Sequence, residues 1–480
     1  MTVRLRYAPS PTGHLHIGGA RTALFNYLYA KKHGGTYILR IEDTDQNRNK
    51  ENAEVGFMNG FEWLGLLWDE GPRVGGEYGP YSCMERLDIY REYTDKLLAE
   101  GKAYPCYCSE EELEAEREEL SAKGELPRYL GKCRHLTTEQ KAAHEAAGHK
   151  FTIRFRVPDD HVLKFHDMIR GEIEFESNGI GDFVIVKSDG IPTYNFAVTI
   201  DDALMKISHV VRGEEHLSNT PRQLLIYEAF GWTLPEFAHL PLILNETGKK
   251  LSKRDESIVQ FIEQYEEMGY LPEAINNFLA LLGWSPGGEQ EMFTMDELIE
   301  QFSFERVQKS GATFDSGKLA WMNGQYIKSA DLDRIVDLAI PFLQKAGFLA
   351  DDFDRAWVTQ LVALFKDGLT SVSEMAEHAA LFFETEVAYD EEAKAVLSEE
   401  SVPTVLAAFR DKAQNVETFN AESIQAALKE VQKETGFKGK QLFMPVRVAA
   451  TGHVHGRDLN MTLALLGREK VVNRLTQLVQ

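Results

Sequence analysis

Residues 6–19 read RYAPSPTGHLHIGG, and the organisation of the rest of the chain follows from this stretch. The apolar run at 3–8 predicts a strand, and residues 20–32 predict a helix. The loop between them ends in His-Ile-Gly-Gly, where glycines and the unpaired N–H groups of a helix start can approach a phosphate. The stretch therefore indicates a phosphate-binding corner. A plain strand–loop–helix corner with surface histidines is the alternative.

Composition excludes several classes of protein. The chain has 480 residues, 43% of them hydrophobic, and a net charge of −23. This length predicts about three domains. The acidic balance argues against wholesale, nonspecific nucleic-acid binding, which needs a basic surface, and four cysteines are too few for a disulfide framework. We expect a cytoplasmic protein, because no apolar run approaches the roughly 20 residues that span a membrane and residues 1–4 lack a signal-peptide pattern.

Strand and helix patterns alternate in two separate parts of the chain. The first part has predicted strands at 3–8 and 36–43 and predicted helices at 20–32, 52–68 and 86–99. The second has predicted strands at 180–186, 207–211 and 240–244 and a predicted helix at 221–230. This alternation is typical of an α/β nucleotide-binding domain. Between the two parts, a capping box at Ser109 opens a very acidic helix, and after Ser257 helices dominate.

A basic loop follows the predicted strand 240–244. Residues 249–254 read KKLSKR, which places four cations within six positions. Such a loop can close over a triphosphate, because its ammonium groups stabilise the charge that builds up on a leaving pyrophosphate. A solvated basic turn is the alternative. The order of the two features, the glycine-containing corner first and the basic loop second, favours a nucleotide site.

Two pairs of potential metal ligands lie between the two α/β parts. Cys106 and Cys108 form one pair and Cys133 and His135 the other, separated by residues 109–132. Thiolates and an imidazole in two close pairs can complete a tetrahedral Zn²⁺ site. Four protein ligands leave no open position, so a structural role is expected. The alternative is three buried thiols and a surface histidine.

The chain resembles the bacterial glutamyl-tRNA synthetases, a family of class I aminoacyl-tRNA synthetases. Residues 16–19 resemble the HIGH signature of that class, with Gly19 in place of the second histidine, and 250–254 resemble its KMSKS signature. Three further runs are similar to the family's: RIEDTD at 40–45, PTY at 192–194 and LFMPVR at 442–447. The matches span nearly the whole chain in order.

The resemblance implies an α/β fold with a Rossmann-type class I catalytic domain, an inserted α/β domain and all-α domains after them. It assigns 1–83 and 193–256 to the two halves of the catalytic domain. It assigns 84–192 to an inserted domain that binds the acceptor end of tRNA and carries the zinc site. The range 257–324 becomes a helical stem-contact region, and 325–480 a helical anticodon-binding domain. A monomer is expected.

The resemblance also implies a reaction in two steps. L-Glutamate and ATP give glutamyl-adenylate and pyrophosphate, and the glutamyl group then passes to the 3′-terminal adenosine of tRNA(Glu). The first nucleophile is the substrate's own α-carboxylate, so no protein nucleophile or general base is needed. Catalysis then comes from positioning and charge stabilisation, with Mg²⁺ bound alongside ATP sharing the phosphate charge. In this family, activation characteristically requires tRNA.

Roles for individual residues follow from the same resemblance. Catalysis is expected from His16, Gly18, Lys250, Ser252 and Lys253, and ATP binding from His16, Gly18, Gly19 and Lys253. Glutamate binding is expected from Arg6, Ser10, Glu42, Tyr194 and Arg212. A guanidinium fork suits the side-chain carboxylate of glutamate, and Arg6 is expected in that role. Without the resemblance, Arg6 would be a strand arginine paired with an acid, and Glu42 an ordinary strand-end carboxylate.

Other proteins share parts of this pattern. A glutamyl-queuosine-tRNA synthetase-like protein lacks the helical tail that 325–480 predict, and a glutaminyl-tRNA synthetase ends in β-barrels. A small-molecule nucleotidyltransferase would be shorter, and an RNA-binding scaffold derived from a synthetase would be expected to lack the intact basic loop. Charging of tRNA(Gln) beside tRNA(Glu) stays open. Some discriminating relatives place an arginine near 366–368, which here read KDG, and its absence favours relaxed specificity.

Overall fold

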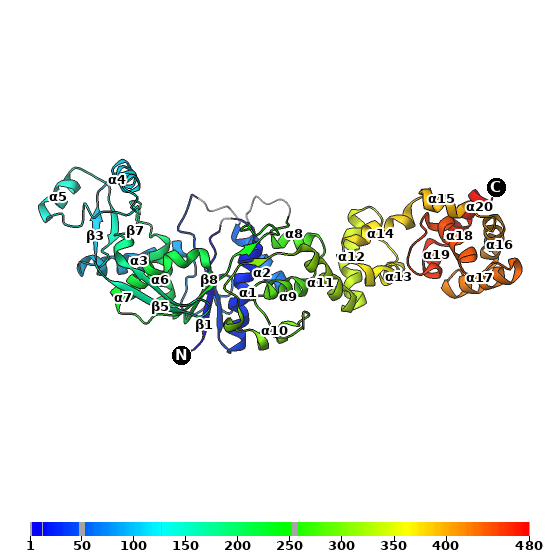
Figure 1. Ribbon diagram of the computed structural model, residues 1–480, viewed down its shortest axis with the longest axis horizontal. Helices are drawn as coiled ribbons and strands as arrows, with labels where there is room; N and C mark the ends of the chain where they lie inside the picture. The colour runs from blue at the N-terminus through cyan, green and yellow to red at the C-terminus, as the bar shows by residue number, and fades with distance from the viewer. Residues whose placement is uncertain (1, 12, 48–52, 126, 252–257, 480) are drawn as a thin grey trace. The chain divides into compact units, whose positions relative to one another are not determined.

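The computed structural model describes residues 2–11, 13–47, 53–125, 127–251 and 258–479 (Figure 1). The chain forms two compact units. The first holds Met1–Tyr265 and Pro272–Ser316, and the second holds Glu266–Leu271 and Gly317–Gln480. Within the described residues, no helix combines the length and apolar character needed to cross a membrane.

A six-stranded sheet forms the centre of the first unit. Its strand order is β2-β1-β8-β9-β5-β6, parallel except for the antiparallel pair β5–β6. The strands are β1 Arg4–Tyr7, β2 Thr36–Leu39, β5 Val162–Asp167, β6 Gly171–Glu176, β8 His209–Gly213 and β9 Glu236–Leu240. The parallel strands confirm the α/β class. They bring the carboxyl ends of β1, β8, β9 and β5 to one edge, where ligands bind in open α/β sheets.

Helices cover this sheet because their apolar residues match the apolar strand positions. Helix α1 packs against β1, β2 and β8 and also against α9 and α10. Helices α3, α6 and α7 share a buried core with Ile38, Val210 and Phe237 of the strands. The helices around this sheet include α1 Ile17–Lys32, α2 Ala53–Leu64, α3 Leu87–Ala99, α6 Tyr194–Leu204, α7 Thr220–Phe230, α9 Pro272–Leu281 and α10 Met295–Gln301, with α8 Ile262–Glu267 at the boundary.

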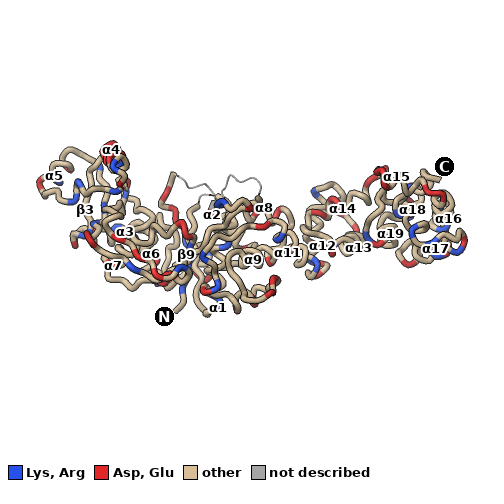
Figure 2. The backbone as a smooth tube through the Cα atoms, viewed as in Figure 1, with Lys and Arg blue, Asp and Glu red and all other residues tan. Residues whose placement is uncertain are grey.

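A second, three-stranded antiparallel sheet lies between the two α/β parts. It consists of β3 Ala103–Cys106, β4 Thr152–Phe155 and β7 Val184–Val186 and is flanked by α4 Glu110–Ala122 and α5 Thr138–Ala146. The capping box predicted at Ser109 is confirmed, since Ser109 accepts from the Glu112 amide and Glu112 accepts from the Ser109 amide. Acidic residues gather on α4 (Figure 2).

The sheets divide the expected insertion differently from the sequence boundaries. Strands β5 and β6 lie within 84–192, yet they belong to the main sheet, where Asp167 pairs in register with Phe237 of β9. Leu163, Phe165 and Asp167 alternate with exposed residues along β5 and are buried, so the strand has one face for the core. Within this range, the smaller sheet is thus separate from the main sheet.

Two further elements differ from the sequence prediction. The predicted strand 180–186 is shorter in the structure, where β7 holds only Val184–Val186, and the run 192–194 leads into helix α6. The predicted strand 240–244 splits at Pro241 into the end of β9 and a short strand β10 Ile243–Leu244, which pairs with β11 Ala312–Thr313. Proline carries no N–H for a ladder and so breaks the strand.

Among its described residues, the second unit contains helices and no strand. They are α11 Ser316–Ser329 from its second residue onward, α12 Leu332–Lys345, α13 Arg355–Phe365, α14 Glu374–Phe383, α15 Glu391–Leu397, α16 Val402–Asn415, α17 Ala421–Thr435, α18 Lys440–Thr451, α19 Leu459–Leu466 and α20 Arg468–Leu478. Apolar residues spaced along single helix faces lie in one core, which includes Ile335 and Leu343 of α12 and Ile424 and Val431 of α17. The all-α prediction for this region is confirmed.

Candidate active site and metal cluster

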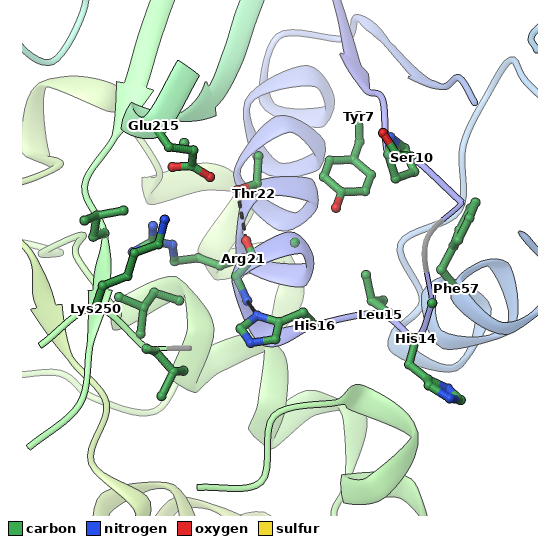
Figure 3. A pocket seen from close by; sticks show the side chains of 18 of the residues that line it. Tyr7, Ser10, His14, Leu15, His16, Arg21, Thr22, Phe57, Glu215 and Lys250 are labelled. Carbon is green, nitrogen blue, oxygen red and sulfur yellow. Dashed lines mark hydrogen bonds between the residues drawn. The ribbon is translucent and has the colours of Figure 1, made fainter. Parts of the chain in front are cut away.

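A cavity of about 350 Å³ opens at the carboxyl ends of β1 and β8. Its walls come from the loop 7–19, the first turn of α1, Gly213 and Glu215 after β8, and the segment 241–251. Figure 3 shows Lys250 and Ser10 on opposite sides, with His16 between them. The structure thus brings the glycine-containing corner and the described residues Lys250 and Leu251 of the basic loop to one cavity.

His16 caps the helix that begins beside this cavity. Its Nδ1 accepts a hydrogen bond from the Gly18 amide at 3.1 Å, and its Nε2 lies 3.2 Å from Oε1 of Gln260. Because Nδ1 accepts, the neutral ring carries its proton on Nε2 and donates it to Gln260. The ring's one proton is therefore engaged by Gln260, and it is the partial positive charge at the start of the helix that suits an anionic ligand.

Gly19 departs from the class signature for a steric reason. A Cβ atom at this position would overlap the Tyr7 hydroxyl, and Tyr7 lines the same cavity. Burial raises the pKa of the Tyr7 phenol, so the group stays a neutral hydroxyl. In this chain the tyrosine occupies the volume next to residue 19, and only glycine fits there.

The basic loop is only partly described. Lys250 is exposed, lines the cavity and forms a bridge with Leu244, while Leu251 is buried. The Asn245 side chain accepts from the Lys249 amide at 3.0 Å, which shapes the turn before it. The remaining predicted residues lie outside the described residues: Ser252, Lys253 and Arg254.

Arg6 points into a network of buried ions. Its guanidinium donates to both oxygens of Asp202, at 2.9 and 3.0 Å, and both side chains are buried. Arg40, fully buried, also contacts Asp202 at 2.9 Å. Burial acts to raise the pKa of Asp202, but the two arginines outweigh it and the pKa is lowered. The pairing of a strand arginine with an acid is therefore observed.

Glu42 belongs to the same network. Its Oε1 accepts from Arg40 at 2.9 Å, and the Cys83 thiol donates to its Oε2 at 3.2 Å. Burial raises the pKa of Glu42. Asp201, the neighbour of Asp202, anchors the far end of the network. Ser10, by contrast, is exposed at the cavity.

Arg212 has a different environment. Its Nε donates to Nε2 of His239 at 3.2 Å and its Nη2 to Thr220 Oγ1 at 2.8 Å. Its Nη1 is buried without a hydrogen-bond partner in the described part of the chain, where no carboxylate pairs with this guanidinium. Burial lowers the pKa of Arg212. This is a buried cation whose charge is not matched by an acid.

Tyr194 lies close enough to Arg6 and Arg212 for their charges to affect its pKa. It opens α6, and its hydroxyl lies 3.4 Å from Nδ1 of His216. Burial raises the pKa of Tyr194, while the nearby charges of Arg212 and Arg6 act to lower it and that of Glu42 acts to raise it. Four of the five residues expected around glutamate thus lie within electrostatic reach of one another.

Three of the four expected metal ligands converge. The sulfurs of Cys106, Cys108 and Cys133 lie within 4.8 Å of one another. His135 is exposed and is not part of this cluster. The Tyr129 hydroxyl instead lies 3.5 Å and 3.6 Å from the first two sulfurs and accepts from the Cys133 amide at 2.8 Å. The hydrogen bond from the Cys133 thiol lowers the pKa of Cys106 to about 4, whereas burial raises the pKa of Cys108.

Sequence reasoning did not single out several residues of this site. Asp202, His239 and Tyr129 belong to no recognised motif. Arg21 was also missed, although it is buried on α1 and donates to the carbonyls of Leu282, at 3.0 Å, and Pro241. One signal was available: charged residues inside apolar runs, such as the Asp201–Asp202 pair at the end of an apolar stretch, need partners when buried.

Two family models match the chain. The catalytic domain of tRNA synthetases class I (E and Q) matches residues 2–321, and an anticodon binding domain matches residues 334–479. Curated relatives match along their whole length. A glutamate–tRNA ligase of Halalkalibacterium halodurans is 59% identical over 480 residues, covering 99% of each chain. One of Bacillus subtilis is 57% identical over 476 residues, covering 98% of this chain and 99% of the relative.

Solved structures agree with these matches. A glutamate tRNA ligase from Elizabethkingia meningosepticum, in complex with its amino acid, superposes with a TM-score of 0.91 at 36% identity. The match covers 100% of this chain and 99% of that one. A glutamate-tRNA synthetase from Elizabethkingia anophelis gives the same TM-score and identity, with 100% of both chains covered.

Proposed function

The chain belongs to the glutamate–tRNA ligase family of class I tRNA synthetases, and from this premise we propose how its residues carry out the reaction. The chain joins L-glutamate to tRNA(Glu) with ATP as the activating substrate. A glutamyl-queuosine-tRNA synthetase-like activity is not favoured, because the relatives match over the full length including the helical second unit. A cytoplasmic location is part of the proposal and rests on the supply of ATP and tRNA there.

In the first step, an α-carboxylate oxygen of glutamate attacks the α-phosphorus of ATP and pyrophosphate leaves. The neutral His16 ring and the start of α1 bind the nucleotide, and Gly18 and Gly19 allow its close approach. Lys250 faces this corner across the cavity, and with Ser252 and Lys253 it stabilises charge on the leaving group. Mg²⁺ bound with ATP would share the phosphate charge.

Glutamate is recognised beside the nucleotide. Ser10 and Glu42 hold the region of the α-ammonium and α-carboxylate groups, with Glu42 fixed by Arg40 and Cys83. Arg212 holds the side-chain carboxylate, with Tyr194 and Arg6 beside it. The buried, unpaired Nη1 of Arg212 is the observation that carries this assignment, because a substrate carboxylate supplies both the missing acceptor and the missing negative charge.

Replacement of Arg212 tests this assignment. In R212M, kcat/KM for glutamate in ATP–pyrophosphate exchange with saturating tRNA should fall about a thousandfold, as when a buried charge-assisted contact to a substrate is lost. The KM for ATP should stay near the wild-type value. R212K keeps the positive charge but lacks the planar guanidinium, so its kcat/KM for glutamate should lie between those of the wild type and R212M. Unchanged glutamate kinetics in R212M would contradict the assignment.

We propose that the three-cysteine cluster binds structural zinc. The fit rests on three converging sulfurs, two of them buried and the third partly buried, which are ligands that Zn²⁺ prefers. We keep His135 as the proposed fourth ligand. The Tyr129 hydroxyl is the alternative, because it already contacts two of the sulfurs. Metal analysis should find about one zinc per chain in the wild type and none in C133S. Comparison of H135A with Y129F then identifies the fourth ligand by loss of zinc.

The second unit is proposed to read the anticodon. It contains a cavity of about 540 Å³ whose lining includes two arginines, three histidines and the ring of Phe365: Arg447, Arg457, His378, His453 and His455. Phe365 stacks on His378 with ring centres 4.6 Å apart. Cations and aromatic rings of this kind can hold an unstacked base. The 84–192 and 257–324 ranges are proposed to contact the acceptor end and the stem.

Specificity for one or two tRNAs is proposed to depend on the wall of this cavity near residue 368. A Cβ atom at Gly368 would overlap the guanidinium of Arg457, so Arg457 occupies the volume that a side chain at 368 would take. We expect relaxed specificity, with glutamate charged onto both tRNA(Glu) and tRNA(Gln). Aminoacylation assays on the two purified tRNAs check this expectation, and charging of tRNA(Glu) alone would contradict it.

A further inference from the structure

Three neighbouring strands of the main sheet each contribute one buried polar side chain to a single chain of hydrogen bonds. Arg212 lies on β8, His239 on β9 and Asp167 on β5, and these strands are adjacent in the sheet. Arg212 pairs in register with His239. Asp167 pairs in register with Phe237, which lies two residues before His239 on β9. His239 and Asp167 are fully buried and Arg212 is 5% exposed, so water cannot rearrange the contacts between them.

The carboxylate of Asp167 fixes the tautomer of His239. Its Oδ2 accepts from Nδ1 of His239 at 2.6 Å and from the His239 amide at 3.1 Å. Its Oδ1 accepts from the amides of Ile169 and Arg170 at 3.0 and 2.9 Å. Four donors surround the two oxygens, so the group is an oriented carboxylate. The imidazole must then keep its one proton on Nδ1 and present a lone pair at Nε2.

That lone pair faces Arg212 and also lies 3.1 Å from the Thr220 hydroxyl. The guanidinium donates Nε–H to Nε2 of His239 and Nη2–H to Thr220 Oγ1. Two of its three nitrogens are thereby held, and Nη1 stays unpaired within the described residues. We propose that Asp167 and His239 are positioning residues for glutamate selectivity, because together they hold the Arg212 fork in the one orientation that leaves Nη1 for the side-chain carboxylate. The inference rests on the proposed role of Arg212.

The neutral imidazole explains how orientation is achieved without loss of charge. A carboxylate in direct contact would orient Arg212 equally well but would neutralise it, as Asp202 neutralises Arg6 at 2.9 Å. His239 accepts the hydrogen bond without carrying a negative charge, and the charge of Asp167 lies one ring further away. Coulomb attraction falls with distance, so Arg212 keeps more of its positive charge for the substrate.

The variant D167N tests the proposal. The oxygen of the introduced amide would keep the two loop amides, and its NH₂ group would face His239, which forces the imidazole proton onto Nε2. Nε2–H would then oppose Nε–H of Arg212, donor against donor. The KM for glutamate should rise about tenfold or more, as for loss of a hydrogen bond to a charged group. The KM for ATP should not change, and discrimination against glutamine should fall.

A second pair of variants keeps the test decisive where D167N does not fold. In H239Q, the amide oxygen can accept from Arg212 without any tautomer, so the glutamate KM should stay within about threefold of the wild type. In H239L, the acceptor is lost, and the KM should rise about tenfold. H209Q is the matched control, because His209 lies at the other end of β8 and should leave both KM values unchanged.

The outcomes distinguish the proposed role of Arg212 in glutamate binding from the proposed positioning role of Asp167 and His239. An unchanged glutamate KM in D167N, or equal KM values in H239Q and H239L, would overturn the positioning role while R212M still shows its loss. An unchanged glutamate KM in R212M would overturn the proposed role of Arg212 itself. The assay in each case is ATP–pyrophosphate exchange by the full chain with saturating tRNA, with L-glutamate varied at fixed ATP and then ATP varied at fixed L-glutamate.

Discussion

Two arginines on adjacent strands, Arg6 on β1 and Arg212 on β8, have opposite electrostatic environments. Arg6 is paired with both oxygens of Asp202, inside a network that also holds Arg40 and Glu42. Arg212 contacts a neutral imidazole and a hydroxyl and pairs with no carboxylate in the described part of the chain. Family resemblance alone treats both as substrate contacts. This difference underlies our proposal that Arg6 mainly supports the site and that Arg212 carries the charge that selects glutamate.

Burial is the reason that this difference matters. A buried cation without a matching acid is unfavourable for folding, and proteins retain such groups where function requires them. A buried ion pair is different, because removal of one partner leaves the charge of the other buried without its counter-charge. The two arginines should therefore respond to the same substitution with opposite changes in stability.

The largest stability effect is expected at Arg6. In R6M, Asp202 would keep only Arg40 as its partner, so the free energy of unfolding should fall by about 3 kcal/mol. Urea denaturation followed by circular dichroism measures this, with R73M as the control because Arg73 forms an exposed pair with Glu62. An unchanged unfolding free energy in R6M would remove the distinction between the two arginines.

The same substitution at Arg212 should act in the other direction. R212M removes a buried cation that no carboxylate neutralises in the described part of the chain, and replaces it with an apolar side chain of similar length. The free energy of unfolding should stay the same or rise by about 1 kcal/mol, although activation of glutamate is lost. The same urea titration provides the comparison, and a destabilisation as large as that of R6M would show that Arg212 is a structural residue.

A smaller effect concerns acid stability. The folded-state pKa of Asp202 is lowered, so between the folded and unfolded pKa values the unfolded chain binds more protons. Asp202 therefore stabilises the fold at neutral pH, and this contribution is lost as pH falls below about 4. In D202N, the free energy of unfolding should depend less steeply on pH in that range. A slope equal to that of the wild type would mean that Asp202 is not the group being protonated.

Much of the fold could be predicted from the sequence because local patterns determine it. The strand–loop–helix corner, the capping box at Ser109 and the apolar stripes of the second unit all depend on residues close in the chain. Strands β5 and β6 could not be assigned to the main sheet, because their sheet neighbour β9 begins only at Glu236, far along the chain. Non-local pairing of this kind leaves no local signal.

In the site, too, residues in local motifs could be predicted, whereas residues that act through distant contacts could not. Motif residues such as His16 and Lys250 were found, and the structure places them on one cavity. Asp202, His239 and Tyr129 were missed because their roles depend on contacts between distant segments. Arg6 pairs with a residue 196 positions away. The sequence could name both arginines, but only the contacts show which one lacks a matching acid.

A crystal structure of the chain with L-glutamate bound tests the central claim most directly. The measured quantity is the distance from each guanidinium nitrogen to the side-chain carboxylate of the ligand. We predict a contact of about 2.7–3.0 Å between a carboxylate oxygen and Nη1 of Arg212, with the Arg6–Asp202 pair intact. A carboxylate bound to Arg6 in place of Asp202, with Nη1 of Arg212 unengaged, would contradict it.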